Sequence, residues 1–412
     1  MKTYLLALFS CFFLTARAQS DLAVVGARVY PSPGTPPIEH GVVLIKNGKI
    51  VAVGDQQRVK VPANLRVIDG KGLVLLAGFW NSHVHFMSPV WEHADSLPAA
   101  QLTAQLTEML TSHGFTHAFD LATLNFRNLR ALRDRVRSGE VDGPAILSAG
   151  EPFVPPNGSP FYVRPIKLPE ISTPEDAVAY VKKQLDAGAD AIKIWSASPI
   201  GDNKIVAMPI DIIKAAATTA HQYHKPVFAH PTSDTGMRVA VTGGADILAH
   251  VSPDGYVGWK QADVDMLRQH HVAVIPTLKL YKWELEREKV PNPEEHKLVK
   301  TAIEQIGVFA KGGGEILFGT DVGYISDFST EDEFRFLGAA GLTFDQILTS
   351  LTTAPAKRFG MAEQSGRIAK GLDADLVLLK ADPHADVRNF AAIAYTIRKG
   401  KVIYDAQASD KK

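Results

Sequence analysis

The chain has 412 residues, of which 46% are hydrophobic and 21% are charged, and these proportions are ordinary for a globular protein. Its 44 Lys and Arg residues balance its 44 Asp and Glu residues, so no net charge favours nucleic acid or an acidic membrane surface. The length exceeds that of one small domain and suits a barrel of roughly 250 residues with an accessory module.

Residues 1–18 have the pattern of a secretory signal peptide. Lys2 supplies the positive end, residues 4–14 are apolar, and Ala16-Arg17-Ala18 is an A-x-A cleavage site. We therefore expect the mature protein to begin at Gln19 and to be periplasmic or secreted. The single cysteine, Cys11, lies inside this segment, so the mature chain would have neither disulfides nor a thiol nucleophile. A lipid on Cys11 is the alternative, although the apolar stretch before it is short, and no later stretch could span a membrane.

Both ends of the mature chain are rich in short strand-like segments. Strands are predicted over 22–30, 41–46, 49–53, 65–69, 374–379 and 394–404, with a turn at Lys399-Gly400 inside the last range. Asn47-Gly48 is a strong hairpin turn between two of the strands. These segments predict a small β-sandwich domain built from both termini, residues 19–78 and 356–412.

The middle of the chain, residues 79–355, alternates between apolar strands and amphipathic helices. After the strand that ends near residue 83, strands are predicted over 115–119, 145–149, 191–195, 227–229, 247–249, 272–275 and 316–319. Helices are predicted over 175–187, 210–223 and 344–351, the first with Thr173 as its N-cap. Eight β/α units predict an α/β fold of the (β/α)8 TIM-barrel class.

The pair His83-Val84-His85 follows the apolar run of residues 72–80. Side chains alternate along a strand, so both imidazoles point to one face and form a potential metal clamp. An accidental pair on a surface or in a core is the alternative for this motif alone.

Further polar residues follow other predicted strands, at the barrel end that carries catalytic groups. Lys193 lies in the fourth strand, His230 and His250 end the fifth and sixth, and Asp321 follows the eighth. Alternation points Lys193 into the barrel, where a lone ammonium is costly. It could form a salt bridge with an Asp, or react as a neutral amine with carbon dioxide to give a carbamate ligand.

These motifs resemble the amidohydrolase superfamily over nearly the whole mature chain. The similar segments are GFWNSHVHF (78–86), GADAIKIW (188–195), VFAHP (227–231), DILAHVSP (246–253), ILFGTDVG (316–323), GLDADLVLLKADP (371–383) and TIRKGKVIYD (396–405). They stand in the order that the family requires.

The resemblance implies a site with two divalent metal ions. His83, His85 and Asp321 would hold the more buried ion, His230 and His250 the other, and carboxylated Lys193 would bridge them. A hydroxide between the ions would attack the substrate, and Asp321 would act as the catalytic proton shuttle. This donor set suits zinc, and manganese or cobalt also fits.

The resemblance favours hydrolysis over deamination, because Lys193 is present and no glutamate closely follows His230. The sequence is most similar in its motifs to the imidazolonepropionase-related branch of the family, which includes Xaa-Pro dipeptidases. We expect cleavage of an amide or peptide C–N bond in a dipeptide or N-acyl amino acid. A lactonase or cyclic-amide hydrolase is the alternative, and a non-catalytic relative that only binds is another. We expect the binding partner to be a small-molecule substrate, with no nucleic acid and no membrane span. The sequence leaves the oligomeric state open, and a homo-oligomer is compatible with it.

Three residues on predicted loops, Tyr162, Arg164 and Tyr281, are candidate substrate contacts. Several other polar residues are assigned packing or solvated roles instead, namely His93, His113, His117, His270, His271 and the charged run 284–289. Asp120, at the end of the second barrel strand, could aid binding or cap a helix.

Overall fold

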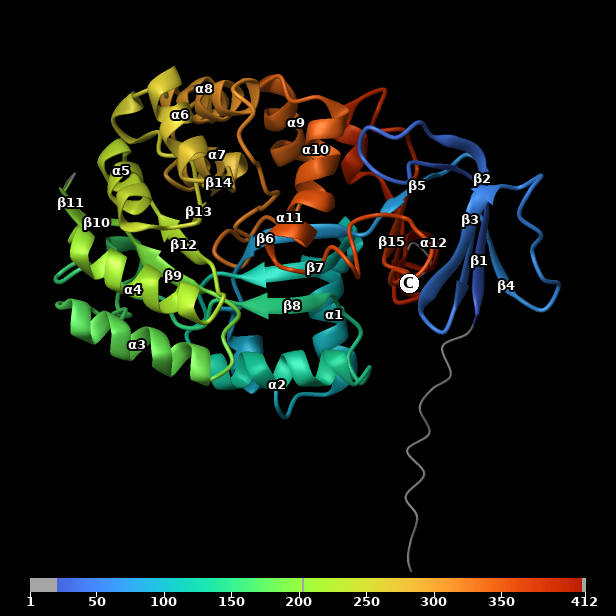
Figure 1. The fold of residues 1–412 in the computed structure, drawn as a ribbon, viewed down its shortest axis with the longest axis horizontal. Coiled ribbons are helices and arrows are strands. Elements are labelled where there is room, and N and C mark those ends of the chain that lie inside the picture. The colour runs from blue at the N-terminus through green and yellow to red at the C-terminus, as the bar shows by residue number, and fades with distance from the viewer. Residues whose placement is uncertain (1–20, 202–203, 410–412) are drawn as a thin grey trace, which may run out of the picture.

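The computed structural model describes residues 21–201 and 204–409. The predicted signal segment, with Cys11, lies outside this part. An α/β body occupies most of the molecule, and a separate sheet at one side joins segments from both ends of the chain (Figure 1).

The separate sheet has eight strands in the order β17-β16-β15-β5-β1-β2-β3, with β4 paired to β1. Their bounds are β1 (Leu22–Val29), β2 (Ile38–Lys46), β3 (Lys49–Asp55), β4 (Arg66–Asp69), β5 (Val74–Ala77), β15 (Leu376–Leu379), β16 (Ile393–Arg398) and β17 (Lys401–Asp405). Asn47 and Gly48 both have positive φ, 50° and 75°, as a two-residue hairpin turn with the twist of a sheet requires. The pairing of both chain ends and the hairpin are confirmed, whereas the two-layer sandwich and the domain boundaries remain predictions.

The α/β body contains two parallel sheets, ordered β6-β7-β8 and β14-β13-β12-β9. The strands are β6 (Phe79–Val84), β7 (Phe115–Asp120), β8 (Ala145–Ser148), β9 (Ile192–Trp195), β12 (Val227–His230), β13 (Ile247–Leu248) and β14 (Ala273–Val274). Isolated parallel bridges continue the pairing, Phe153 with Ile194, Val274 with Ile316 and Val84 with Val322. A short hairpin of β10 (Ala197–Gly201) and β11 (Lys204–Ala207) follows β9.

The predicted strand at 316–319 is less regular than expected. Leu317 N–H donates to Val274 O, and Ser82 N–H donates to Phe318 O, so the segment is paired on both sides. Within this segment Ile316 forms an isolated bridge with Val274 in place of a continuous ladder, and the chain turns soon afterwards at Asp321, whose φ is 61°.

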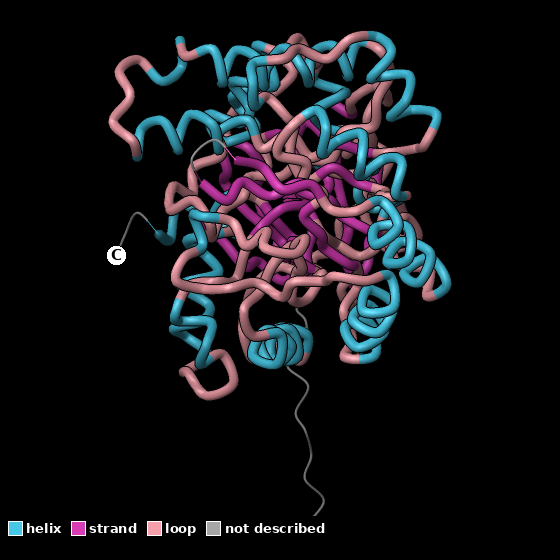
Figure 2. The backbone as a smooth tube through the Cα atoms, turned by 90° about the vertical axis from the view of Figure 1, so that its left-hand side faces the viewer, coloured by secondary structure: helices cyan, strands magenta, loops and turns pink. Residues whose placement is uncertain are grey.

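Helices surround the central strands (Figure 2). They are α1 (Ala99–Met109), α2 (Phe126–Arg137), α3 (Pro174–Asp186), α4 (Ile210–Gln222), α5 (Asp234–Gly243), α6 (Gln261–Gln269), α7 (Leu278–Arg287), α8 (Lys297–Lys311), α9 (Glu331–Ala339), α10 (Phe344–Leu351), α11 (Thr353–Arg358) and α12 (Ala406–Ser409). The three predicted helices correspond to α3, α4 and α10. Thr173 caps α3 by accepting a hydrogen bond from Asp176 N–H at 3.1 Å.

The core has an outer layer between strands and helices and an inner layer among the strands. Ile192 and Ile194 pack in the outer layer, and Ala191 packs in the inner one beside Phe119 and Phe228. Strand alternation therefore turns Lys193, which shares a face with Ala191, toward the inside.

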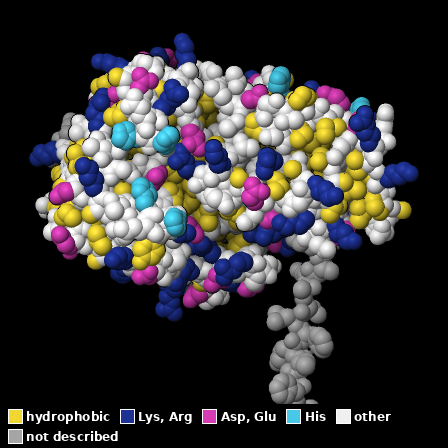
Figure 3. Space-filling model, viewed as in Figure 1, with side chains coloured by type: hydrophobic (Ala, Val, Ile, Leu, Met, Phe, Trp, Pro, Cys, Tyr) yellow, Lys and Arg dark blue, Asp and Glu magenta, His cyan; other side chains and the backbone are white. Residues whose placement is uncertain are grey.

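The surface carries positive and negative side chains intermingled on the face seen in Figure 3. Across the described chain, every helix is too short or too polar to traverse a bilayer.

Candidate active site

Two histidines and one aspartate converge at one end of the strands. His83 lies in β6, His85 directly follows it, and Asp321 follows the segment that bridges back to β6. Asp321 Oδ1 is 3.1 Å from His83 Nε2 and 2.8 Å from His85 Nε2, and the two Nε2 atoms are 3.2 Å apart. All three side chains are buried.

The second nitrogen of each histidine fixes its tautomer. His83 Nδ1 is 2.8 Å from Ala249 O, and His85 Nδ1 is 3.3 Å from Ala122 O. A carbonyl oxygen only accepts, so each Nδ1 carries the proton and each Nε2 presents a lone pair. Burial lowers the pKa of His83 to about 4, which keeps this ring neutral at pH 7.

Three lone pairs therefore point at one buried place. Asp321 Oδ1 has no hydrogen-bond donor in the described structure, although buried polar atoms almost always have a partner. A divalent cation bound by two imidazole nitrogens and one carboxylate oxygen would satisfy all three atoms. These residues thus fit a metal ion.

Lys193, His230 and His250 lie beside this cluster. The His250 ring centroid is 4.7 Å from that of His83 and 4.5 Å from that of His230. Lys193 is 1% exposed and forms no salt bridge within the described chain, so the salt-bridge alternative is wrong. Its Nζ instead lies 5.2 Å from the ring centroid of Trp195. Burial lowers the pKa of Lys193 to about 7.

One partner of the cluster, Thr277, was not identified from sequence, and Asp120 has a role different from the two that were predicted. Thr277 Oγ1 donates to Pro276 O at 2.8 Å and lies 2.7 Å from His250 Nδ1. Asp120 accepts hydrogen bonds from Phe86 N–H and the Ser148 hydroxyl. Asp120 thus anchors the backbone next to His85 and caps no helix.

The six predicted metal ligands line one cavity of about 540 Å³. Tyr162, Arg164 and Tyr281 line it too, so the structure brings all nine candidates together. Tyr281 differs from expectation in its position, because it lies inside α7 and not on a loop. Its hydroxyl donates to Val251 O at 2.8 Å.

One face of α7 forms a wall of this cavity. Glu284, Arg287 and Glu288 line it together with Leu280 and Tyr281. Glu284 is partly buried, so the prediction of a solvated run over 284–289 is wrong for this residue, whereas Arg287 and Glu288 are exposed as predicted. Leu280, Glu284, Arg287 and Glu288 have the spacing i, i+4, i+7, i+8, which puts them on one stripe of the helix. The sequence could not say which stripe faces a cavity and which faces water.

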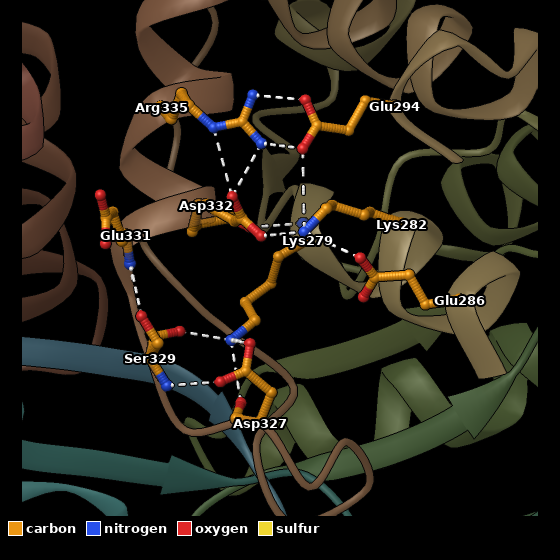
Figure 4. A network of polar contacts seen from close by, with 10 residues as sticks. Lys279, Lys282, Glu286, Glu294, Asp327, Ser329, Glu331, Asp332 and Arg335 are labelled. Carbon is orange, nitrogen blue, oxygen red and sulfur yellow. Dashed lines mark hydrogen bonds and ion pairs between the residues drawn. The ribbon is translucent and has the colours of Figure 1, made fainter. Parts of the chain in front are cut away.

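The start of α7 is tied to the loop after Asp321 by a polar network (Figure 4). Lys279 is buried, and its Nζ donates to Asp327 O at 2.8 Å and to Ser329 O. Farther along, Lys282 contacts Asp332 Oδ2 at 2.7 Å, and Arg335 joins Asp332 to Glu294. The network thereby holds one cavity wall against the segment that carries Asp321.

Close backbone packing also restrains that segment. Gly323 has φ of 97°, and a Cβ built there would lie 1.8 Å from His85 O. Only glycine is accommodated at this contact between the Asp321 loop and the end of β6.

The discounted histidines lie away from the cavity lining, as predicted. His117 is buried against Trp80, with ring centroids 4.1 Å apart, and His113 contacts Glu108 O at 3.1 Å.

A family model described as "Amidohydrolase family" matches residues 74–403. The chain belongs to the amidohydrolase family. It is 23% identical to an ochratoxinase from Aspergillus niger over 372 residues, which cover 80% of this chain and 75% of the relative.

Solved structures agree with this assignment. A Xaa-Pro dipeptidase with bound methionine superposes with a TM-score of 0.80 at 20% identity, covering 94% of this chain and all of the other. A putative prolidase from Bifidobacterium longum gives a TM-score of 0.79 at 24% identity, covering 94% and 95% of the two chains. These likenesses show the amidohydrolase fold. The family makes this protein a metal-binding hydrolase that acts on carbon–nitrogen bonds.

Proposed function

We propose that this amidohydrolase uses two divalent metal ions to cleave the amide or peptide C–N bond of a small substrate, of the dipeptide or N-acyl amino acid type. The observation that carries the proposal is the convergence of His83 Nε2, His85 Nε2 and Asp321 Oδ1 on one buried point. Three further candidate ligands line the same cavity, Lys193, His230 and His250.

Each residue has a proposed role at the end of a closed (β/α)8 barrel. His83, His85 and Asp321 would hold one ion, His230 and His250 the second, and a carbamate on Lys193 would bridge them, with zinc the metal that suits the donors. Bound ions would lower the pKa of a water molecule and polarise the scissile carbonyl. The Asp321 carboxylate would accept the proton of the attacking water and deliver it to the leaving nitrogen.

Relatives support an amide substrate, since they include proteins named Xaa-Pro dipeptidase, prolidase and ochratoxinase. The buried Lys193, with its lowered pKa, supports the bridging role because a neutral amine can form a carbamate. A lactonase or cyclic-amide hydrolase would use the same residues. A non-catalytic binding protein is disfavoured because every predicted ligand is retained.

The test is a hydrolysis panel with zinc-loaded protein. It contains dipeptides, including Xaa-Pro, together with N-acyl amino acids, lactones and cyclic amides. We expect free amine from the first two classes. Ammonia released from adenine, cytosine or guanine compounds, without acyl cleavage, would contradict the proposal.

We further propose export, with cleavage after Ala18. The charged start, apolar core and A-x-A site support it. Sequencing the N-terminus of protein purified from its host should give Gln19 first. An intact Met1 in a cytosolic fraction would contradict export, and a lipidated Cys11 would replace it with membrane anchoring.

A further inference from the structure

Five charged side chains line the cavity besides the candidate metal ligands, namely Arg164, Asp254, Glu284, Arg287 and Glu288. Glu284 accepts a hydrogen bond from the Tyr324 hydroxyl at 2.9 Å and lies 3.8 Å from Arg287. The Arg287 guanidinium also lies 5.0 Å from the ring centroid of Trp283. Glu284 and Arg287 thus compensate each other, and Glu288 is exposed to water.

Asp254 is different, because its carboxylate has no hydrogen bond or ion pair with any residue of 21–201 or 204–409. It begins the short helix Asp254–Tyr256 after β13 and is partly withdrawn from water. Burial, the single cause, raises the pKa of Asp254 to about 6. A partly buried carboxylate without a hydrogen-bond or ion-pair partner would be stabilised by a cation bound in the cavity.

Arg164 is the opposite case, a water-exposed cation that lines the same cavity and has no anionic partner in the described structure. Its guanidinium donates one hydrogen bond, to Ile200 O at 3.0 Å, and forms no ion pair with the part of the chain described. Most of its five N–H donors are therefore available, in a fork that fits a carboxylate.

The two side chains come from different sides of the cavity. Arg164 lies on the long connection after β8, and Asp254 follows β13, with β9 and β12 between these strands in the pairing order. Tyr162, Trp195 and Leu280 line the same cavity. A ligand with an apolar body and two opposite charges would complement this arrangement.

We propose that the cavity selects a zwitterionic substrate, a free dipeptide whose ammonium pairs with Asp254 and whose carboxylate pairs with Arg164. This specificity rests on the proposed function and narrows it. An N-acyl amino acid carries the carboxylate but no ammonium, so it would leave Asp254 uncompensated in the complex. The pairing therefore distinguishes the two substrate types of the proposed function, the dipeptide and the N-acyl amino acid.

The test compares a free dipeptide with its N-acetyl derivative and its C-terminal amide, using zinc-loaded protein. Asp254→Asn should raise KM about 10- to 100-fold for the dipeptide and leave the N-acetyl derivative unchanged, because one charge-assisted hydrogen bond is lost. Arg164→Gln should raise KM for the dipeptide and the N-acetyl derivative but not for the amide. Equal effects on all three compounds would overturn the proposal.

Two control variants distinguish the loss of a specific contact from the general effect of removing one charge from the protein. Asp95→Asn removes an exposed carboxylate outside the cavity, and Arg367→Gln removes an exposed guanidinium that, like Arg164, donates to one backbone carbonyl. Both should leave the three KM values unchanged.

Binding measurements distinguish this proposal from the proposed function. If no compound is hydrolysed, the proposed function fails, and calorimetry of the dipeptide and its N-acetyl derivative still decides the specificity. We expect the dipeptide to bind zinc-loaded protein more tightly and to lose that advantage in Asp254→Asn. Equal affinities in the unsubstituted protein would overturn the selection of a zwitterion.

Discussion

His250 Nδ1 lies 2.7 Å from Thr277 Oγ1, and this contact decides which nitrogen of the ring faces the cavity. The hydroxyl proton of Thr277 is directed at Pro276 O, which can only accept. The oxygen therefore accepts from His250 Nδ1–H, and His250 Nε2 keeps its lone pair. Thr277 has φ of 47°, a costly conformation for a β-branched residue that persists only where the surroundings enforce it.

Thr277→Val should weaken metal binding about 10- to 100-fold, the usual effect of losing a partner that orients a ligand. Valine keeps the shape but cannot accept the proton of His250 Nδ1. Thr277→Ser keeps the hydroxyl and serves as the control. Titration with zinc against a chromophoric chelator measures the affinity, and unchanged binding in the valine variant would remove Thr277 from the site.

Asp321→Asn should keep the fold and at least one metal ion, yet lower kcat by about two to four orders of magnitude, the range of general acid–base catalysis. Asparagine retains an oxygen that can act as a ligand but cannot take a proton. Circular dichroism and metal analysis check the fold and the ion, and steady-state kinetics check the rate. A kcat in this variant equal to that of the unsubstituted protein would exclude Asp321 as the proton shuttle.

The candidate ligands could be predicted because their placement follows from local periodicity. His83 and His85 share a face of one strand, and Lys193 shares a face with Ala191, because side chains alternate with a period of two. Strand order then brought residues far apart in sequence to one end of the fold. The helix capped by Thr173 was predictable for the same reason, since its pattern is contained in a few consecutive residues.

Other parts of the site depend on contacts that no local pattern contains. Tyr281 and Glu284 belong to a helix whose charged stripe looks solvated in sequence, and only its packing turns that stripe toward the cavity. The bond from His250 to Thr277 requires left-handed backbone at a threonine, which its residue type disfavours. The left-handed turn at Asp321 is likewise something that the apolar run 316–319 does not reveal.

Lys193→Ala should lower both bound metal and activity. We expect about two zinc ions per unsubstituted chain, and fewer in the variant because the bridging carbamate cannot form. Short carboxylic acids should partly restore both quantities, since a carboxylate can occupy the space of the carbamate. Elemental analysis and kinetics with and without acetate provide the measurement. Full metal content and activity in the variant would contradict the bridging role.

Glu333 gives a prediction about stability and pH. Its side chain is completely buried on α9, Oε2 accepts from Lys279 N–H at 2.8 Å, and Oε1 has no partner in the described structure. Burial raises the pKa of Glu333 from 4.5 to about 7, although Lys279 opposes this effect. Between pH 4.5 and about 7, Glu333 has released its proton in the unfolded chain but still holds it in the folded chain. The free energy of unfolding therefore falls as pH rises through this range.

The expected loss of unfolding free energy between pH 4.5 and 7 is at most about 3.5 kcal/mol, since each unit of pKa difference corresponds to about 1.4 kcal/mol. Glu333→Gln carries no titratable proton and should remove this part of the pH dependence. Urea unfolding at pH 5, 6, 7 and 8 measures it, with Glu331→Gln, an exposed change on the same helix, as the control. We expect Glu333→Gln to gain stability relative to the unsubstituted protein as pH rises from 5 to 8. A difference that stays constant across these pH values would show that Glu333 titrates normally despite its burial.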